Sequence, residues 1–175
     1  PGRALYRLGP ATGKRGKMKK LAFLILLCAL IHCLAKPAVS ETTGMDAPEF
    51  KAFWGRFRTT IERHLRRPYV WGSSGLKSFD CSGFVWRVMK DSGVLIKRTT
   101  ARKFYLSLPA VEQDQEYRPG NIVFFDDLKH CGIVSNEQKF YHAGSSTGTT
   151  IDSFDPYWRH KVIGFRAIPV PDISR

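Results

Sequence analysis

The sequence predicts an α+β domain in which helices near the N-terminus pack against one side of a small antiparallel sheet. Apolar residues recur at helical spacing in the segment before residue 92, and short β-type runs separated by turn residues follow residue 120. Helices first and antiparallel strands afterwards is the pattern of this fold class. The chain has 175 residues, which is about one domain, so neither repeats nor several domains are expected.

The N-terminal segment has the pattern of an export signal. Met18 and two lysines precede a largely apolar run of fourteen residues, 21–34, and small residues then lead up to Ser40. This run is too short for a comfortable membrane span, so we predict a signal peptide over 18–40 that is cleaved after Ser40. Cleavage after Ala35 and an uncleaved anchor are the alternatives. No stable membrane anchor is expected after cleavage.

Positive charge is concentrated in the same segment. Residues 1–40 hold eight Lys or Arg and no Asp or Glu, in a chain whose formal net charge is +13. The predicted mature domain, residues 41–175, is therefore mildly basic, which suits an anionic surface such as a cell-wall polymer or lipid headgroups but not nucleic-acid binding. Residues 1–17 precede Met18 and are interpreted as an upstream, non-native extension. We expect a periplasmic or extracellular protein.

Two main helices are predicted ahead of the sheet. Residues 46–66 carry apolar side chains at spacings of three and four, and Pro68 stops that helix. The second helix begins at Cys81 and runs to Asp91, with Gly93 where a C-terminal cap belongs. Both are amphipathic, so each is expected to bury one face.

The second half of the chain is predicted to form the sheet. A short helix is expected over 100–106 and a polar surface loop over 109–120. The predicted strands cover residues 121–125, 131–135, 140–143, 149–151 and 162–168. Their spacing is that of a meander.

Cys81 is the candidate nucleophile. A cysteine in the first turn of a helix lies beside free backbone N–H groups and the positive end of the helix dipole, and both stabilise a thiolate. Asp80, Ser82 and Gly83 flank it with small or polar side chains that leave the sulfur accessible. Such a nucleophile needs a base and normally a third group that orients the base.

His130 and His142 are the candidates for these two roles. A turn centred near Asn136 would place the two histidines directly opposite each other on neighbouring strands, with both side chains on one face. Their Cβ atoms would then be roughly 5 Å apart. One imidazole would take the proton from Cys81 and the other would hold the first in position.

The remaining cysteine of the domain is expected in the core. Cys131 follows His130, so alternation along the strand points it to the opposite face as a buried free thiol. A disulfide to Cys81 and a metal site are the alternatives. A zinc site here would lack a C-x-x-C pair and would need adjacent strand residues to face one metal, so no metal is expected. His64 and His160 are expected on the surface.

Five motifs occur in order along the predicted domain. They are Arg67-Pro-Tyr-Val-Trp-Gly72, Phe79-Asp-Cys-Ser-Gly-Phe-Val85, Arg118-Pro-Gly-Asn-Ile-Val-Phe-Phe125, His130-Cys-Gly-Ile-Val134 and Phe140-Tyr-His-Ala143. Together they resemble the NlpC/p60 family of cell-wall cysteine peptidases, from about Pro68 to Phe165. Each motif alone is weak, but the D-C-S-G helix start followed by H-x-G-I and H-A is specific in combination.

The resemblance implies a papain-like α+β fold with a cysteine active site. Cys81 would be the nucleophile, His130 the general base and His142 the third, orienting residue. Tyr69 would help to form the oxyanion hole with the Cys81 backbone N–H. The residues implied to line the substrate cleft are Asp80 and Ser82. The family hydrolyses peptide bonds in bacterial cell-wall stem peptides, commonly between γ-D-glutamate and a diamino acid, and needs no cofactor.

The expected function is therefore that of an exported cysteine endopeptidase. It would hydrolyse amide bonds in peptidoglycan stem peptides through a thioester on Cys81. One alternative is an acyl or amide transferase on the same fold, in which an amine or alcohol resolves the thioester. The other is a non-catalytic wall-binding module, against which the full set of Cys81, His130 and His142 counts.

Overall fold

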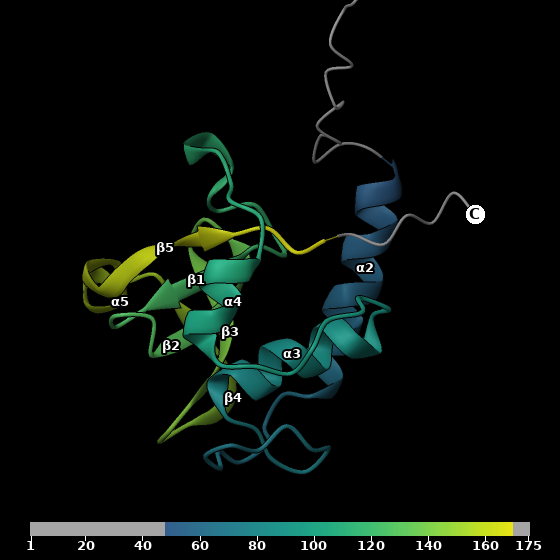
Figure 1. Ribbon diagram of the computed structural model, residues 1–175, viewed down its shortest axis with the longest axis vertical. Coiled ribbons are helices and arrows are strands. Elements are labelled where there is room, and N and C mark those ends of the chain that lie inside the picture. The colour runs from purple at the N-terminus through teal and green to yellow at the C-terminus, as the bar shows by residue number, and fades with distance from the viewer. Residues whose placement is uncertain (1–47, 170–175) are drawn as a thin grey trace, which may run out of the picture. The chain divides into compact units, whose positions relative to one another are not determined.

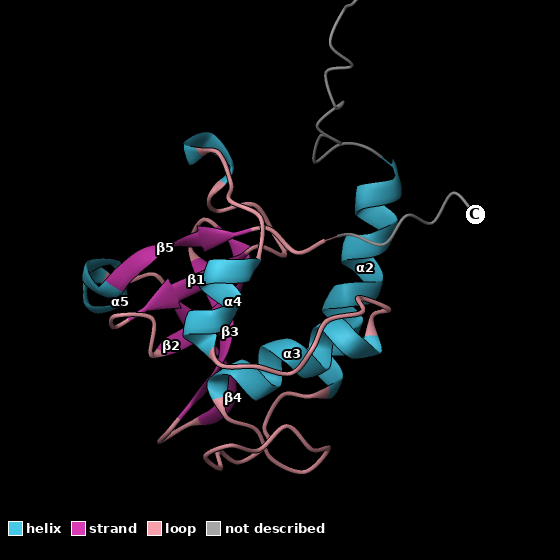
Figure 2. Cartoon of the chain, viewed as in Figure 1, coloured by secondary structure: helices cyan, strands magenta, loops and turns pink. Residues whose placement is uncertain are grey.

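A computed structural model describes residues 48–169 of the chain. The predicted signal peptide and the extension ahead of it lie outside these residues. Helices and a five-stranded antiparallel sheet make up the described part (Figures 1 and 2), which confirms the predicted α+β fold class. None of the helices between residues 48 and 169 has the length and apolar character needed to cross a membrane.

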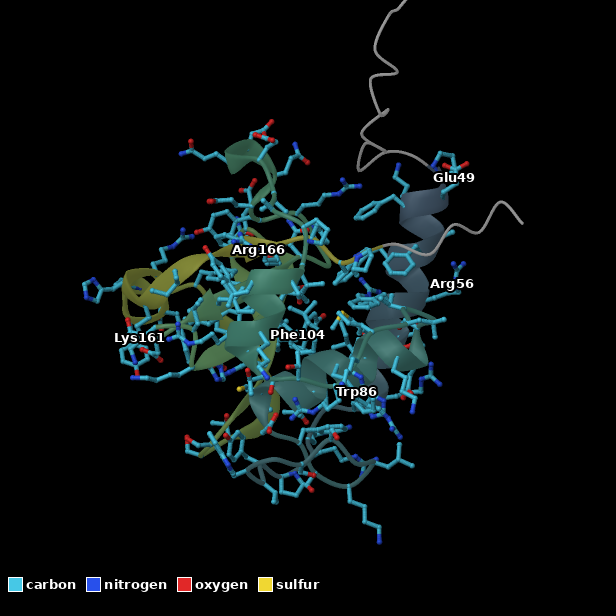
Figure 3. All side chains as sticks on the ribbon, viewed as in Figure 1. Glu49, Arg56, Trp86, Phe104, Lys161 and Arg166 are labelled. Carbon is cyan, nitrogen blue, oxygen red and sulfur yellow. The ribbon has the colours of Figure 1, made fainter. Side chains whose placement is uncertain are left out.

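Helix α2 (Pro48–Arg63) corresponds to the first predicted helix and packs on α3. Its buried apolar stripe consists of Phe53, Phe57 and Ile61, each four residues after the last. The helix ends three residues earlier than predicted because the chain turns away, and Arg66 adopts a φ of 60°. The Arg66 N–H donates to the carbonyl oxygen of Thr149 at 2.8 Å, which fixes this turn to strand β4 (Gly148–Ser153). In Figure 3, Glu49 and Arg56 lie on the outer side of α2.

Helix α3 (Cys81–Asp91) begins and ends where the sequence predicts. Asp80 is its N-cap, because its Oδ1 accepts the N–H of Gly83 at 2.5 Å. The buried side chains of α3 face strands β2 (His130–Asn136) and β3 (Lys139–Gly144). Helix α4 (Ala101–Ser107) matches the short predicted helix, and its Phe104 is fully buried (Figure 3). The loop after it contains one 3-10 turn, η1 (Gln113–Gln115).

The sheet has the strand order β4-β3-β2-β1-β5 with antiparallel neighbours throughout. The strands are β1 (Ile122–Phe125), β2 (His130–Asn136), β3 (Lys139–Gly144), β4 (Gly148–Ser153) and β5 (Val162–Arg166). The predicted meander describes β1 to β4. Strand β5 departs from it and pairs with β1 at the other edge, after a helix α5 (Pro156–Lys161) that the sequence reasoning did not predict.

Two hydrophobic clusters lie on the two faces of the sheet. The helix-side cluster joins α2, α3 and α4 to alternate strand residues that include Phe124, Cys131 and Ile133. The α5-side cluster contains the residues between them, such as Phe125 and Val134, and Trp158 of α5 packs against it. This alternation is the period-two pattern of a sheet buried on both faces. It separates Cys131 from the ring of His130, which contacts Trp158 and Phe125 on the other face.

Candidate active site

Cys81 lies at the N-terminus of α3, next to the start of strand β2. Its side chain is almost buried, with 6% exposed. In the thiol form, Sγ donates a long hydrogen bond of 3.7 Å to the carbonyl oxygen of Lys129. The pKa of Cys81 is lowered to about 5, first by a hydrogen bond from the Cys131 thiol and then by a hydrogen bond and the charge of His130, although burial acts in the opposite direction. Cys81 is therefore a thiolate at neutral pH.

A row of hydrogen bonds runs from His130 into the sheet. His130 Nε2 lies 2.8 Å from His142 Nδ1, and His142 Nε2 lies 3.1 Å from Asp152 Oδ2. The pKa of His142 is lowered to about 4 by burial and by the charge of His130, although Asp152 opposes this shift. Neutral His142 donates its Nε2–H to the carboxylate and accepts the Nε2–H of His130 on Nδ1. Because Nε2 of His130 is engaged by His142, its Nδ1 remains available to interact with Cys81.

The two histidines are close, as predicted, but the predicted register is wrong. Gly132, not His130, is the direct partner of His142, and the hairpin contains a register shift between Val134 and Asn136. His130 is therefore a diagonal neighbour on the same face. A Cβ on Gly132 would come within 2.7 Å of the Tyr141 carbonyl oxygen and 3.2 Å of the His142 Cβ. Glycine at this position keeps the space around His142 open and β2 close to β3.

Two residues of this site were missed by the sequence reasoning. Asp152 comes just after the predicted fourth strand, and the observed register pairs His142 with Thr150, so Asp152 is a diagonal neighbour of His142. Trp158 lies on the unpredicted helix α5, where its ring stacks on His130 with centroids 5.6 Å apart and meets His142 edge-on at 5.2 Å. An acidic residue two positions beyond the partner of a buried histidine is the signal that could have found Asp152.

Tyr69 is placed close enough to the nucleophile to interact with it electrostatically. The pKa of its phenol is raised by burial first and then by the negative charges of Cys81 and Asp80. The phenol therefore stays protonated and remains a hydrogen-bond donor. A donor beside the nucleophile has the chemistry required of an oxyanion-hole group.

Asp80 and Ser82 do line a cavity with Cys81, but their polar atoms are occupied. Arg98 contacts both carboxylate oxygens of Asp80 through Nη2, each at 2.9 Å. The Ser82 hydroxyl donates to Asp80 at 3.1 Å and accepts from Arg98 Nη1 at 3.0 Å. Both residues are buried. Both residues bind Arg98, and Asp80 also caps α3. We therefore expect Arg98, rather than Asp80 or Ser82, to contact the substrate.

The cavity beside Cys81 has a volume of about 310 Å³. Its charged lining consists of Arg98, Arg102, Lys129 and Asp80. The ring of Trp71, 84% exposed, stands at its edge. The Cys81 thiolate is a second anionic group of the lining. Three cationic groups against these two leave the lining net positive, which favours an anionic ligand group.

The loop between β1 and β2 that borders this cavity is strained. Asp126, Asp127 and Leu128 have φ values of 50°, 54° and 66°, in the left-handed region that non-glycine residues disfavour. Such a conformation costs about 1–2 kcal/mol per residue. The conformation of this loop determines where the Lys129 carbonyl and the first residue of β2, His130, lie relative to Cys81. Backbone strain of this kind is frequent at functional sites.

Cys131 is a free, fully buried thiol, as predicted. Its effect on the pKa of Cys81 was not predicted, because strand alternation alone gives no information on where a helix docks. Within residues 48–169 no group of three His, Cys, Asp or Glu is arranged to hold a metal ion. The prediction for His64 is wrong: it is 8% exposed and bonded to Asp91 at 2.9 Å. His160 is exposed, as expected.

Three relatives of known name are similar to this chain. It is 33% identical over 108 residues to "Probable endopeptidase p60" of Listeria seeligeri, covering 59% of this chain and 20% of that protein. "Gamma-DL-glutamyl hydrolase" of Bacillus subtilis is 29% identical over 113 residues, covering 60% and 27%. "Murein DD-endopeptidase MepH" of Escherichia coli is 30% identical over 156 residues, covering 82% and 57%. The chain thus spans about a fifth of the length of the Listeria protein.

A solved structure and a family match complete the comparison. The crystal structure of a protein of the NLP/P60 family from Staphylococcus aureus superposes with a TM-score of 0.60 at 24% identity, over 69% of this chain and 42% of that one. This likeness confirms the papain-like fold. A sequence model described as the NlpC/P60 family matches residues 66–167, which is more than half of the chain. The chain therefore belongs to the NlpC/P60 family.

Proposed function

We propose that this protein is a cysteine endopeptidase that hydrolyses amide bonds in peptidoglycan stem peptides. The observation that carries the proposal is the position of Cys81 at the start of α3, with its Sγ against the Lys129 carbonyl next to His130. His130 begins the hydrogen-bonded row that continues through His142 to Asp152. The lowered pKa of Cys81 supports the same role. The names of the relatives, which include endopeptidases and a murein hydrolase, support the substrate class. The basic, signal-like N-terminus supports export to the periplasm or the cell exterior.

The geometry suggests a role for each group in the reaction. The Cys81 thiolate attacks the amide carbon, and the oxyanion accepts hydrogen bonds from the Cys81 backbone N–H and the Tyr69 phenol. His130 Nδ1–H protonates the leaving amine as the thioester forms. The same nitrogen then takes a proton from the water that hydrolyses the thioester. His142 and Asp152 do not exchange this proton; they fix the ring orientation and tautomer of His130.

We propose the bond between γ-D-glutamate and a diamino acid as the one that is cut. A γ-linked glutamyl residue keeps its α-carboxylate free near the scissile amide, and the cavity beside Cys81 offers Arg98, Arg102 and Lys129 to an anion. The name of the Bacillus relative, a gamma-glutamyl hydrolase, agrees with this choice. The name of the Escherichia relative favours a second candidate, a DD bond of murein.

Product analysis on defined substrates tests the proposal. The protein and its Cys81→Ala variant are incubated with a monomeric stem peptide and with a DD-cross-linked dimer, and the products are identified by mass spectrometry. We expect cleavage of the monomer at the γ-D-glutamyl bond, with no product from the variant. Cleavage of the dimer alone at its cross-link would support the DD bond instead.

Two further outcomes would contradict hydrolysis itself. Products that carry an added amine or alcohol in place of water would identify a transferase. Intact substrates with both proteins, together with retention on purified sacculi, would identify a wall-binding module.

A further inference from the structure

A second thiol lies in the same buried cluster as the proposed nucleophile. Cys81 and Cys131 are both free, and both belong to the helix-side cluster, where α3 packs on β2. Sγ of Cys81 lies 3.7 Å from the carbonyl oxygen of Lys129, two residues before Cys131 in the chain. This contact places Cys81 over the first residues of β2, on the face of the sheet to which the Cys131 side chain points. The lowered pKa of Cys81, of which Cys131 is the first cause, agrees with this placement.

The two sulfurs differ in access and in protonation. Cys81 lines the cavity of about 310 Å³, so a small reagent can reach it. Cys131 is fully buried, and its pKa is raised well above the usual value, first by burial and then by the hydrogen bond to Cys81. An oxidant therefore reacts with Cys81 first, and Cys131 is shielded from reagents in solution.

We propose that Cys131 is a resolving cysteine, and that oxidation of the site by a peroxide produces a reversible Cys81–Cys131 disulfide that switches the enzyme off. The Cys81 thiolate attacks hydrogen peroxide, giving a sulfenic acid and releasing hydroxide. The Cys131 sulfur then attacks the sulfenic sulfur, and its proton leaves with the hydroxyl group as water. A dithiol reductant restores both thiols by exchange.

The consequence is protection of the nucleophile. An isolated sulfenic acid is oxidised further to a sulfinic acid, which thiols do not reduce, whereas a disulfide stops at the reversible stage. The loss of activity rests on the proposed function, but formation of the disulfide does not. The experiment can therefore contradict the disulfide and the proposed hydrolase activity separately. Formation of the bond brings the two sulfurs to about 2 Å.

Peptide mapping after peroxide treatment tests this proposal on the full chain. We expect a linked pair of peptides containing Cys81 and Cys131, lighter than the separate peptides by two hydrogen atoms, that forms as activity falls. Dithiothreitol should remove the link and restore the activity. The variants Cys131→Ser, which keeps a hydrogen-bond donor, and Cys131→Val, which keeps the volume, are treated in parallel.

Each variant is compared with its own untreated rate, because Cys131 also affects the pKa of Cys81. In both we expect Cys81 to reach the sulfinic acid and dithiothreitol to restore less than about a tenth of the activity, since no disulfide protects the sulfur. The proposal is overturned if wild-type Cys81 becomes sulfinic while Cys131 stays available for alkylation after denaturation. It is equally overturned if the two variants recover as fully as the wild type. The mapping remains decisive if no hydrolysis is detected in any protein.

Discussion

At the scale of single residues, the site is organised by charge and by the proton positions that charge imposes. Asp152 is a carboxylate at the far end of the row, and a carboxylate only accepts hydrogen bonds. It therefore sets the direction of each bond: His142 donates to Asp152, and His130 donates to His142. Only Nδ1 of His130 then remains to face Cys81. Asp152 is thus a positioning residue, because it orients His130 through the imidazole ring of His142.

Replacing Asp152 by Asn tests this direction. An amide can present either its oxygen or its NH2 group, so it no longer fixes the tautomer of His142. Losing one charge-assisted hydrogen bond of about 1.5–3 kcal/mol corresponds to a fall of roughly ten- to a hundred-fold in kcat. We expect KM to change little. Steady-state kinetics over a range of pH measure both constants, with Asp114→Asn on the exposed η1 turn as the matched control. A kcat equal to that of the control would refute the role.

At the scale of elements, the site depends on where α3 begins and on how closely the chain packs around that point. The beginning could be predicted because its signals are local: small or polar residues flank Cys81, and apolar residues at helical spacing follow. Gly83 has a further role that only the structure shows. A Cβ at this position would overlap the carbonyl oxygen of Ser73 and come within 3.0 Å of the Asp80 side chain.

Substitution of Gly83 by Ala should therefore destabilise the domain in spite of its higher helix propensity. Overpacking of this kind costs about 1–3 kcal/mol, and rigid backbone is the group that would have to move. Gly55→Ala in α2 is the matched control, because no atom lies within 4 Å of the added Cβ. Alanine there should stabilise by about 0.5–1 kcal/mol. Urea unfolding measures both changes, and a loss of stability in both variants, or in neither, would contradict the argument.

Several features of the elements could not be read from the sequence. The diagonal placement of His130 and His142 depends on a register shift in the β2–β3 hairpin, and period-two alternation does not reveal such shifts. Helix α5 has only six residues and lacks a repeating apolar stripe, so it gave no periodic signal. The contact of Cys131 with Cys81 depends on how α3 docks on β2, which is a tertiary property. Locally coded features were predicted, and features set by packing were not.

At the scale of the whole molecule, the shifted pKa values predict how stability depends on pH. Cys81 titrates at about 5 in the folded protein and at the ordinary value of 9.0 when unfolded, and His142 titrates at about 4 against 6.5. At pH values between the folded and the unfolded pKa of each group, the unfolded chain binds more protons than the folded protein. The free energy of unfolding therefore rises with pH over that range. For Cys81 this stabilisation is complete above pH 9 and is lost as the pH falls towards 5.

Unfolding of the Cys81→Ala variant isolates this contribution. Between pH 6.5 and 9.0, His142 is neutral in both states and only Cys81 of the two groups still contributes a slope. One proton gives at most about 1.4 kcal/mol per pH unit. We expect the variant to have a flatter curve than the wild type in this window when urea unfolding is repeated at each pH. Parallel curves would show that the thiolate is not preferentially stabilised by the fold.

The central claim is that the fold converts Cys81 into a thiolate well below neutral pH, and direct titration of that thiolate tests it without a substrate. Ultraviolet absorbance of the thiolate is recorded against pH for the wild type, and the spectrum of Cys81→Ala is subtracted at each point. We expect a single transition with a midpoint at about 5. A midpoint near the ordinary value of 9.0 would contradict it, because Cys81 would then enter the reaction as a neutral thiol.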